Sequence, residues 1–417
     1  MAASKFLDRA LLLALIAQHF QSEDRPLGVA VSGGSDSVAL LHLMAGWAGA
    51  PLRCVTVDHR LREASAAEAA QVSAFCADLG IAHDTLTWEG WDGHGNLAAS
   101  ARRARYELMA AWAAQHEISG VVLGHTRDDV AETLLMRLAR SAGVDGLAAM
   151  SARRTIHGVT LHRPLLKAGR ADLRAYLTAQ GAGWIDDPSN VDTRYRRTQA
   201  RIALEALQPV GVTPEALADV AHHLADARRT LGHYAAAEAR ALVQIHYADL
   251  VMPTDGFAAL PPDMARRILS AGLRWITGAG YGPRGPDLDR LRLRLVAGQG
   301  GTLAGCRATS QRGTIRLARE FAAVRRATSS PDTLWDGRWR LTGPDLPDAQ
   351  VRALGPDGRA ACPDWRETGL PLHSVETLPA IWQGDDLIAA PLAGCPSGWS
   401  AALCRGWDDL SSLLLSH

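Results

Sequence analysis

Cysteine and lysine are scarce in this sequence of 417 residues. Six cysteines are scattered along the chain, and no two of them form a Cys-x-x-Cys pair. This spacing argues against an iron–sulfur cluster or a structural zinc site. So few cysteines are typical of a protein from a reducing compartment. Only two lysines occur, Lys5 and Lys167, so nearly all cationic side chains are arginines, a bias to which we attach no function.

Long apolar runs and an excess charge are also absent. No stretch of 18 apolar residues occurs, so the sequence predicts no membrane-spanning helix and no membrane partner. Residues 5–13 contain a short apolar run with an early acid and no convincing cleavage site, which favours an amphipathic helix over a signal peptide. The formal net charge is zero, so a nucleic-acid partner would need a local basic patch. We therefore expect a cytoplasmic protein.

The most informative stretch lies between a short apolar run, residues 27–31, and a helical pattern that begins near Val38. Glycines allow a close backbone approach to a ligand, and a helix N-terminus with nearby hydroxyls favours an anion. The spacing is neither a Walker A loop nor a dinucleotide fingerprint. An ordinary strand-to-helix turn is the alternative to a phosphate-binding loop. The loop consists of Ser32, Gly33, Gly34, Ser35, Asp36 and Ser37.

Residues 52–57 are predicted as a second strand, which is followed directly by Asp58 and His59. In open α/β sheets ligands bind at the carboxyl ends of the strands. These two residues are therefore well placed to contact the nucleoside part of a nucleotide. A solvated loop histidine is the alternative interpretation of His59.

A third strand is predicted at residues 81–86, and a helix follows with Asn96 as its candidate N-cap. Arg102 and Arg105 lie three residues apart and therefore share one face of this helix. They suit a clamp on phosphate charge, because a guanidinium offers a fork of donors. A solvated arginine face is the alternative.

A fourth, wholly apolar strand at residues 120–124 runs into an acidic helix start. Asp128, Asp129 and Glu132 crowd one helical turn, which is unfavourable for like charges. Such a cluster beside a phosphate loop predicts a bound cation, either Mg²⁺ or a substrate ammonium. The alternative is a simple capping box between Thr126 and Asp129.

A local basic patch follows in an otherwise neutral chain. Residues 151–206 carry ten Lys/Arg against five Asp/Glu. A turn sequence, Asp-Pro-Ser-Asn at residues 187–190, precedes a cluster of arginines with one tyrosine. Such a patch suits an RNA backbone, and a solvated helix start is the alternative. The cluster consists of Arg194, Arg196, Arg197 and Arg201.

The second half of the chain changes texture twice. From about residue 205 to 320 the pattern is Ala-rich and helical, with many arginines. From about residue 326 it is rich in Gly, Pro, Asp and Trp, and a hairpin is predicted at Gly384. We predict a catalytic domain at residues 1–205, a helical linker and helical RNA-binding domain at 206–325, and a small β-containing domain at 326–417.

Four motifs and the basic element occur in the order found in one known family. Ser-Gly-Gly-x-Asp-Ser resembles the loop of the PP-loop (N-type ATP pyrophosphatase) superfamily. Val-Asp-His-x-Leu-Arg, Asn-Leu-x-x-x-Ala-Arg-x-x-Arg-Tyr and His-x-x-Asp-Asp-x-x-Glu-Thr resemble motifs of its tRNA(Ile)-lysidine synthetase branch. The resemblance implies an α/β fold with a doubly wound, mostly parallel sheet, followed by a helical domain and a small α+β C-terminal domain.

The resemblance also implies a reaction. Such a ligase uses ATP to join free L-lysine to C2 of cytidine 34 in the CAU anticodon of tRNA(Ile). An adenylated intermediate forms, AMP and pyrophosphate are released, and codon reading changes from AUG to AUA. The loop residues with Asp58, His59 and His125 would bind ATP, and Asp36 and Asp128 would bind Mg²⁺. Arg102 and Arg105 would assist catalysis with Asp36, and the substrate lysine would be held by Asp129 and Glu132. Contacts with the tRNA would come from Arg194, Arg196, Arg197 and Arg201.

Two departures from the family pattern leave details open. Arg140-Ser141-Ala142-Gly143 stands where Arg-Gly-Ser-Gly is usual, and Thr198 replaces an asparagine. A PP-loop tRNA thiolase would share the ATP site but needs a sulfur-carrying cysteine or cluster. A small-molecule amide ligase would not need the arginine cluster or the later domains, and a non-catalytic ATP-binding module would not need the acids. The sequence leaves the oligomeric state open, as a monomer or a homodimer.

Overall fold

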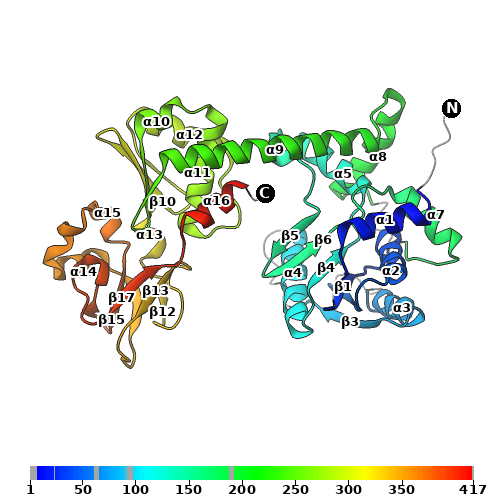
Figure 1. Ribbon diagram of the computed structural model, residues 1–417, viewed down its shortest axis with the longest axis horizontal. Helices are drawn as coiled ribbons and strands as arrows, with labels where there is room; N and C mark the ends of the chain where they lie inside the picture. The colour runs from blue at the N-terminus through cyan, green and yellow to red at the C-terminus, as the bar shows by residue number, and fades with distance from the viewer. Residues whose placement is uncertain are drawn as a thin grey trace. The chain divides into compact units, whose positions relative to one another are not determined.

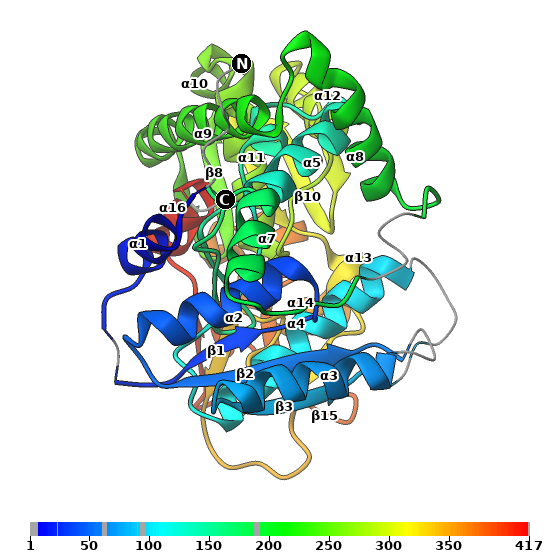
Figure 2. The ribbon, with the colours of Figure 1, turned by 90° about the vertical axis from the view of Figure 1, so that its right-hand side faces the viewer.

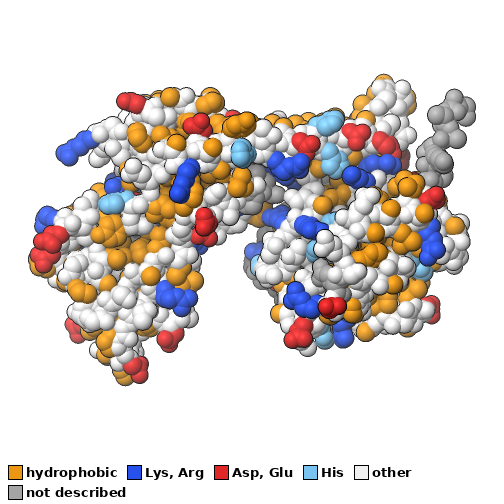
Figure 3. All heavy atoms as spheres, viewed as in Figure 1, with side chains coloured by type: hydrophobic (Ala, Val, Ile, Leu, Met, Phe, Trp, Pro, Cys, Tyr) orange, Lys and Arg blue, Asp and Glu red, His pale blue; other side chains and the backbone are white. Residues whose placement is uncertain are grey.

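The computed structural model describes residues 7–22, 24–60, 65–89, 91, 97–186 and 192–415. The chain divides into two compact units, residues 1–227 and 228–417 (Figure 1). No described helix combines the length and the apolar character that a membrane span requires. Acidic and basic side chains are interspersed on the face shown in Figure 3, in line with the zero net charge.

The first unit is built on a six-stranded sheet whose first four strands in sequence are all parallel. Only the edge pair β5–β6 is antiparallel. The central strands are wholly apolar because both faces of the sheet are covered. Across the sheet the order is β3 (Ala82–Thr87), β2 (Leu52–Asp58), β1 (Leu27–Ala30), β4 (Gly120–Leu123), β6 (Val159–His162) and β5 (Arg153–Ile156).

Helices cover both faces of this sheet and create two cores, which confirms the predicted doubly wound fold (Figure 1). On one face, Val29 and Val122 pack against the apolar sides of α1 (Arg9–His19), α2 (Ser35–Trp47), α3 (Ser65–Asp78) and α7 (Arg170–Ala179). On the other face, Val55 and Val121 pack against Met109 and Trp112 of α4 (Leu97–Gln115). Of the first helix, predicted over residues 5–13, α1 contains residues 9–13, and residues 5 and 6 lie outside the described range.

The remaining helices of the first unit follow the fourth strand. They are α5 (Arg127–Leu138), α6 (Val144–Leu147), α8 (Arg196–Leu207), a short 3₁₀ turn (Gln208–Val210) and α9 (Pro214–Leu242). The division between the two units falls within α9. Its first half contributes Ala218, Ala221 and Ala225 to a core with α5, and its second half contributes Ala235 and Ala239 to the core of the second unit.

The first part of the second unit contains both helices and strands, although the sequence predicted only helices there. A five-stranded antiparallel sheet lies in this region, in addition to α10 (Thr254–Ala259), α11 (Pro262–Thr277) and α12 (Gly285–Val296). Three of its strands are only three to five residues long, too short for the alternation of polar and apolar residues to stand out. The sheet order is β7 (Gln244–His246), β8 (Asp249–Pro253), β11 (Thr314–Arg319), β10 (Cys306–Gln311) and β9 (Gly301–Leu303).

The C-terminal part of the second unit contains the β-structure that the sequence predicted there. The predicted hairpin at Gly384 is confirmed, because β15 (Pro379–Gln383) and β16 (Asp386–Ala389) pair antiparallel around it. A buried carboxylate, Asp249, accepts hydrogen bonds from Arg316 (2.8 Å) and Ser374 (2.5 Å) and so ties this part to the five-stranded sheet. The other elements are α13 (Phe321–Val324), β12 (Thr328–Ser329), β13 (Trp339–Thr342), β14 (Gln350–Ala353), α14 (Gly355–Ala361), a 3₁₀ segment (Pro363–Thr368), α15 (Leu372–Val375), a 3₁₀ turn (Pro391–Ala393), β17 (Ser400–Leu403) and α16 (Trp407–Leu415).

A pair of histidines in the first unit makes its stability depend on pH. Nε2 of His19 lies 3.1 Å from Nδ1 of His162, and burial lowers the pKa of both rings to about 4. In the unfolded chain each ring binds a proton near pH 6.5, so the unfolded state binds more protons between pH 6.5 and 4. The free energy of unfolding is therefore highest above pH 6.5, and it decreases as the pH falls from 6.5 toward 4.

We therefore expect the urea midpoint of unfolding to fall between pH 7.5 and pH 5. The variant His19→Gln removes one ring of the pair and should show a smaller fall. His223→Gln, an exposed histidine on α9, is the control and should retain the fall of the unaltered chain. An equal pH dependence in all three proteins would contradict the assignment.

Candidate functional site

The predicted phosphate loop joins β1 to α2 at the carboxyl end of the central strand. Gly33 has a φ of +86°, a backbone conformation that side chains disfavour. A Cβ at this position would lie 2.5 Å from Cδ1 of Ile185. The backbone oxygen of Gly33 also accepts a hydrogen bond from the amide of Ile185 (2.9 Å). Glycine is therefore required here by both conformation and space.

Serine hydroxyls fix the shape of this loop from within. The Ser37 hydroxyl donates to the backbone oxygen of Gly34 (2.9 Å) and accepts from the amide of Ser32 (3.1 Å). Gly34 is the N-cap of α2 and supplies no side chain to the helix N-terminus. The start of a 13-residue helix is thus left without a side-chain cap, an arrangement that favours a bound anion. The loop fits the phosphates of a nucleotide.

The acidic motif lies beside this loop. β4 is the neighbour of β1, and a Cβ at Gly124 would lie 2.9 Å from the backbone oxygen of Asp36. This close approach brings the start of α5 against the start of α2. Thr126 caps α5 and forms a capping box with Asp129, so the capping interpretation is correct as far as one carboxylate oxygen goes.

The remaining oxygens of the acidic cluster are paired with arginines. Only 1 % of the Glu132 side chain is exposed, and its carboxylate accepts hydrogen bonds from Arg170, Arg197 and Arg201 at 3.2, 2.7 and 2.6 Å. The second oxygen of Asp129 contacts Arg197 (3.1 Å) and Arg170 (3.5 Å). A buried carboxylate is strongly destabilising without such partners.

Arg170 also reaches the phosphate loop. Its Nε donates to Oδ2 of Asp36 (3.0 Å), and its backbone amide donates to Asp128 (2.7 Å). Burial lowers the pKa of Arg170, but the surrounding carboxylates, Asp36 foremost, outweigh this effect and raise it. Burial likewise raises the pKa of Asp36, which Arg170 opposes. One guanidinium thus connects the loop with the acidic cluster.

Asp36 and Asp128 are the two carboxylates predicted to bind Mg²⁺. Both converge on Arg170, from α2 and from α5. Within the described ranges no three His, Cys, Asp or Glu side chains gather as a metal group. Mg²⁺ commonly takes only one or two carboxylates and completes its shell with water and substrate phosphates. The pair therefore fits Mg²⁺ alongside a nucleotide.

Two histidines present unsatisfied ring nitrogens near the loop. Nδ1 of His59 and Nδ1 of His125 are buried and have no hydrogen-bond partner among the described residues. Burial lowers the pKa of His125 to about 4, so this ring is neutral at physiological pH. Burial, and then the charge of Arg105, lowers the pKa of His59. Buried polar atoms of this kind are suited to a ligand's hydrogen-bonding groups.

The predicted arginines divide into outward and inward groups. Arg102 and Arg105 are exposed on α4, where Arg102 lies over the Tyr106 ring (5.2 Å) and Arg105 contacts Nε2 of His59 (3.2 Å). In the basic element Arg194 and Arg196 are exposed. Arg197 and Arg201, by contrast, are the partners of Glu132 described above.

Comparison with known proteins identifies the family. A family model for the PP-loop domain matches residues 9–207. The tRNA(Ile)-lysidine synthase of Ruegeria pomeroyi is 48% identical over 97% of both chains, and that of Wolbachia pipientis wMel is 33% identical over 76% of both. The chain belongs to the tRNA(Ile)-lysidine synthase family. Among solved structures, a U34-tRNA thiolase of Methanococcus maripaludis is 14% identical, with a TM-score of 0.45, and the match covers 52% of this chain and 78% of that one.

Membership of the lysidine synthase family confirms the predicted resemblance and the predicted ATP-binding PP-loop domain. The structure brings together the loop, Asp128, Asp129 and Glu132 and two of the four basic-element arginines. Asp58 is buried at the end of β2, where its Oδ1 accepts from the Arg60 amide (2.8 Å). Asn96 and the Asp-Pro-Ser-Asn turn lie outside the described residues. The individual roles of these residues stay predictions.

Arg170 is a site residue that the motifs do not predict, although a local signal exists. Arg170 is the first residue of α7, where the helix dipole disfavours a cation. An arginine at such a position indicates that acidic partners from elsewhere in the fold hold it. α7 packs against α2, as Figure 2 shows, which supplies one of these partners.

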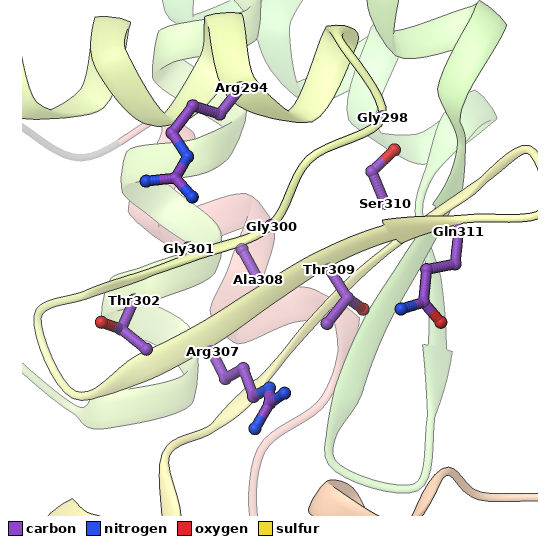
Figure 4. A pocket seen from close by; sticks show the side chains of 10 residues that line it. All are labelled: Arg294, Gly298, Gly300, Gly301, Thr302, Arg307, Ala308, Thr309, Ser310 and Gln311. Atoms are coloured by element: carbon purple, nitrogen blue, oxygen red, sulfur yellow. The ribbon is translucent and has the colours of Figure 1, made fainter.

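A cavity of about 480 Å³ in the second unit is a separate feature (Figure 4). Arg294 and Arg307 line it together with glycine backbone, and no carboxylate contributes. It lacks both a phosphate loop and an acidic group that could hold an amine. Despite its volume, the cavity lacks the groups that the catalytic site of a lysidine synthase requires.

The geometry at Gly33 leads to a prediction. Gly33→Ala forces a left-handed φ on a residue with a Cβ, at about 1–2 kcal/mol, and adds the contact with Ile185. We expect the KM for ATP to rise tenfold or more, measured by pyrophosphate release. Gly80→Ala is the matched control, because its φ is +68° and nothing lies within 4 Å of the added Cβ. It should lose similar stability but keep its KM for ATP, and an equal rise in both variants would contradict a phosphate-binding role.

Proposed function

We propose that this chain ligates L-lysine to C2 of cytidine 34 in the CAU anticodon of tRNA(Ile), with ATP as the energy source. The observation that carries the proposal is that one end of the sheet holds a phosphate loop and a buried pair of carboxylates, connected by Arg170. The full-length similarity to curated tRNA(Ile)-lysidine synthases supports the choice of substrates. A cytoplasmic location, where tRNA and free lysine are both present, is part of this proposal.

The first half of the reaction activates the base. The C2 oxygen of cytidine attacks the α-phosphorus of ATP, and pyrophosphate leaves. The loop residues Ser32–Ser37 hold the departing pyrophosphate through backbone amides and hydroxyls. Asp36 and Asp128 would hold Mg²⁺, which would neutralise phosphate charge. Arg102 and Arg105, exposed on α4, stabilise the charge that develops during the transfer.

The nucleoside part of ATP lies next to the two histidines. Asp58 ends β2, the strand beside the loop strand, and His59 follows it, whereas His125 follows β4 on the other side. His125 is neutral, and its buried Nδ1 has no hydrogen-bond partner among the described residues. It therefore offers a hydrogen bond to the base or ribose without adding charge beside the phosphates.

The second half of the reaction joins lysine to the activated base. The side-chain amine, after losing a proton, attacks C2, and AMP leaves with the former C2 oxygen. Asp129 and Glu132 orient the positively charged lysine before the proton is lost, so that its side-chain nitrogen faces C2. Their burial strengthens this attraction relative to an exposed pair.

The tRNA must present its target base outside any stack, as the bases of an anticodon loop can. Arg194 and Arg196 are exposed in the basic element and would contact the RNA backbone. Arg197 and Arg201 point to Glu132 instead. Their guanidinium groups are therefore engaged by the acidic cluster, and we assign these two residues to the amine site.

A thiolase is the rival with the same ATP site. All six cysteines are free, and four of them are buried. They gather into no metal group within the part of the chain that the structure describes. The similarity over 97% of the chain also extends to the second unit, which a small-molecule ligase would not need.

Radiolabelled lysine tests the proposal. The protein is incubated with ATP, Mg²⁺, labelled lysine and a tRNA(Ile) transcript that carries a CAU anticodon. We expect label in the tRNA together with equimolar AMP and pyrophosphate, and no label in a transcript with uridine at position 34. Pyrophosphate release that depends on ammonia or a sulfur donor, without labelled tRNA, would favour a rival.

Substitutions of the acidic pair test the lysine site in the same assay. Asp129→Asn and Glu132→Gln each remove a charged partner, worth about 1.5–3 kcal/mol. The kcat/KM for lysine should therefore fall by roughly 10- to 100-fold. Asp78→Asn, an exposed acid at the end of α3, is the control and should change nothing. Circular dichroism confirms folding, and an unchanged lysine dependence in folded variants would contradict the assignment.

A further inference from the structure

Arg170 is the residue on which the two halves of the site converge. Its backbone amide is fixed on Asp128 at 2.7 Å, and its guanidinium spans from Asp36 in α2 to Glu132 in α5. The side chain is only 19% exposed. No other described ion pair links the phosphate loop directly with the acidic cluster. The phosphate loop and the acidic cluster therefore share one side chain.

The guanidinium occupies the place of an amine in the acidic pair. Its Nη1 lies 3.2 Å from Oε1 of Glu132, and its Nη2 lies 3.5 Å from Oδ1 of Asp129. A substrate ammonium held by this pair would need the same two oxygens, which also accept from Arg201 (2.6 Å) and Arg197 (3.1 Å). Lysine therefore cannot enter between these oxygens while Arg170 stays where it is.

We propose that Arg170 is a positioning residue that couples the nucleotide site to the amine site. Without nucleotide its guanidinium fills the amine position between Asp129 and Glu132. With nucleotide bound it turns toward the phosphates at the loop and leaves that position open. This inference rests on the proposed function, because it takes the second ligand to be lysine.

The contacts favour movement toward the loop. The Nε contact with Asp36 (3.0 Å) is shorter than either contact with the acidic pair. A triphosphate at residues 32–37 adds several negative charges beside Asp36, and a guanidinium pairs with phosphate through two parallel hydrogen bonds. The backbone amide stays on Asp128, so only the side chain has to turn.

The acidic pair keeps other partners when Arg170 turns away. Arg197 and Arg201 contact Glu132 at 2.7 and 2.6 Å, shorter than the Arg170 contact. The buried carboxylates are therefore never left without a cation, which would be strongly destabilising. When the Arg170 side chain turns, it vacates one position beside the acidic pair. An ammonium that enters this position carries the same charge as the guanidinium that it replaces.

Coupling of this kind is measured as a change in affinity. Lysine binding is followed by isothermal titration calorimetry, with and without a non-hydrolysable α,β-methylene analogue of ATP and Mg²⁺. In the unaltered protein the analogue should tighten lysine binding at least tenfold, and lysine should tighten analogue binding by the same factor. No effect of the analogue on lysine affinity would overturn the proposal.

The variant Arg170→Gln removes the shared side chain. Its lysine affinity should change less than twofold on addition of the analogue, and Arg170→Lys should show an intermediate effect. Arg174→Gln is the matched control, because Arg174 lies one turn along α7 and contacts Ser35 (3.3 Å) but not the acidic pair. It should keep the tenfold coupling. Tenfold coupling in Arg170→Gln would overturn the proposal.

Two further readouts separate this inference from other failures. If Arg170→Gln unfolds, the reciprocal tightening in the unaltered protein and the intermediate value for Arg170→Lys decide the question. If the unaltered protein labels tRNA with lysine but shows no coupling, only this inference fails. If it does not label tRNA at all, the proposed function fails first, and the calorimetry still reports whether the two sites communicate.

Discussion

A buried carboxylate is the constraint on which the site depends. The side chain of Glu132 is 1 % exposed, and a charge at such a position must be paired with cations and hydrogen-bonded. Its three partners come from α7 and α8, which lie 38 to 69 residues further along the chain. Pairing this one carboxylate therefore ties two later helices, α7 and α8, to α5.

The sheet topology places this carboxylate near the loop. Because β1 and β4 are neighbouring parallel strands, their carboxyl ends meet at one edge, and α2 and α5 start side by side. Gly124 allows the contact, since any side chain there would collide with the backbone of Asp36. A single guanidinium can then reach both helices. Strand order, one glycine and one arginine together connect the phosphate loop with the acidic cluster.

The sequence allowed us to predict those parts that local patterns specify. The apolar strands, the loop glycines and the acidic turn could each be found from spacing alone. Arg170 could not be found from spacing, because its partners are remote in sequence and ion pairing leaves no periodic pattern. The inward direction of Arg197 and Arg201 was hidden for the same reason, since a helix start rich in arginine looks alike whether it faces solvent, RNA or a buried acid. The strands near residue 250 were missed because they are too short for an alternation to be recognised.

A pair of buried carboxylates, proposed here to bind an amine, has a general requirement. A pair of acids that waited empty for its substrate would be desolvated without a partner, which costs several kcal/mol. Folding would then either expose the acids or protonate them, and either outcome would weaken the site. Resident arginines solve this problem, because they satisfy the acids in the free protein. An amine bound there as proposed would replace a cation rather than fill an empty site, so its binding would depend on whatever attracts the resident cation.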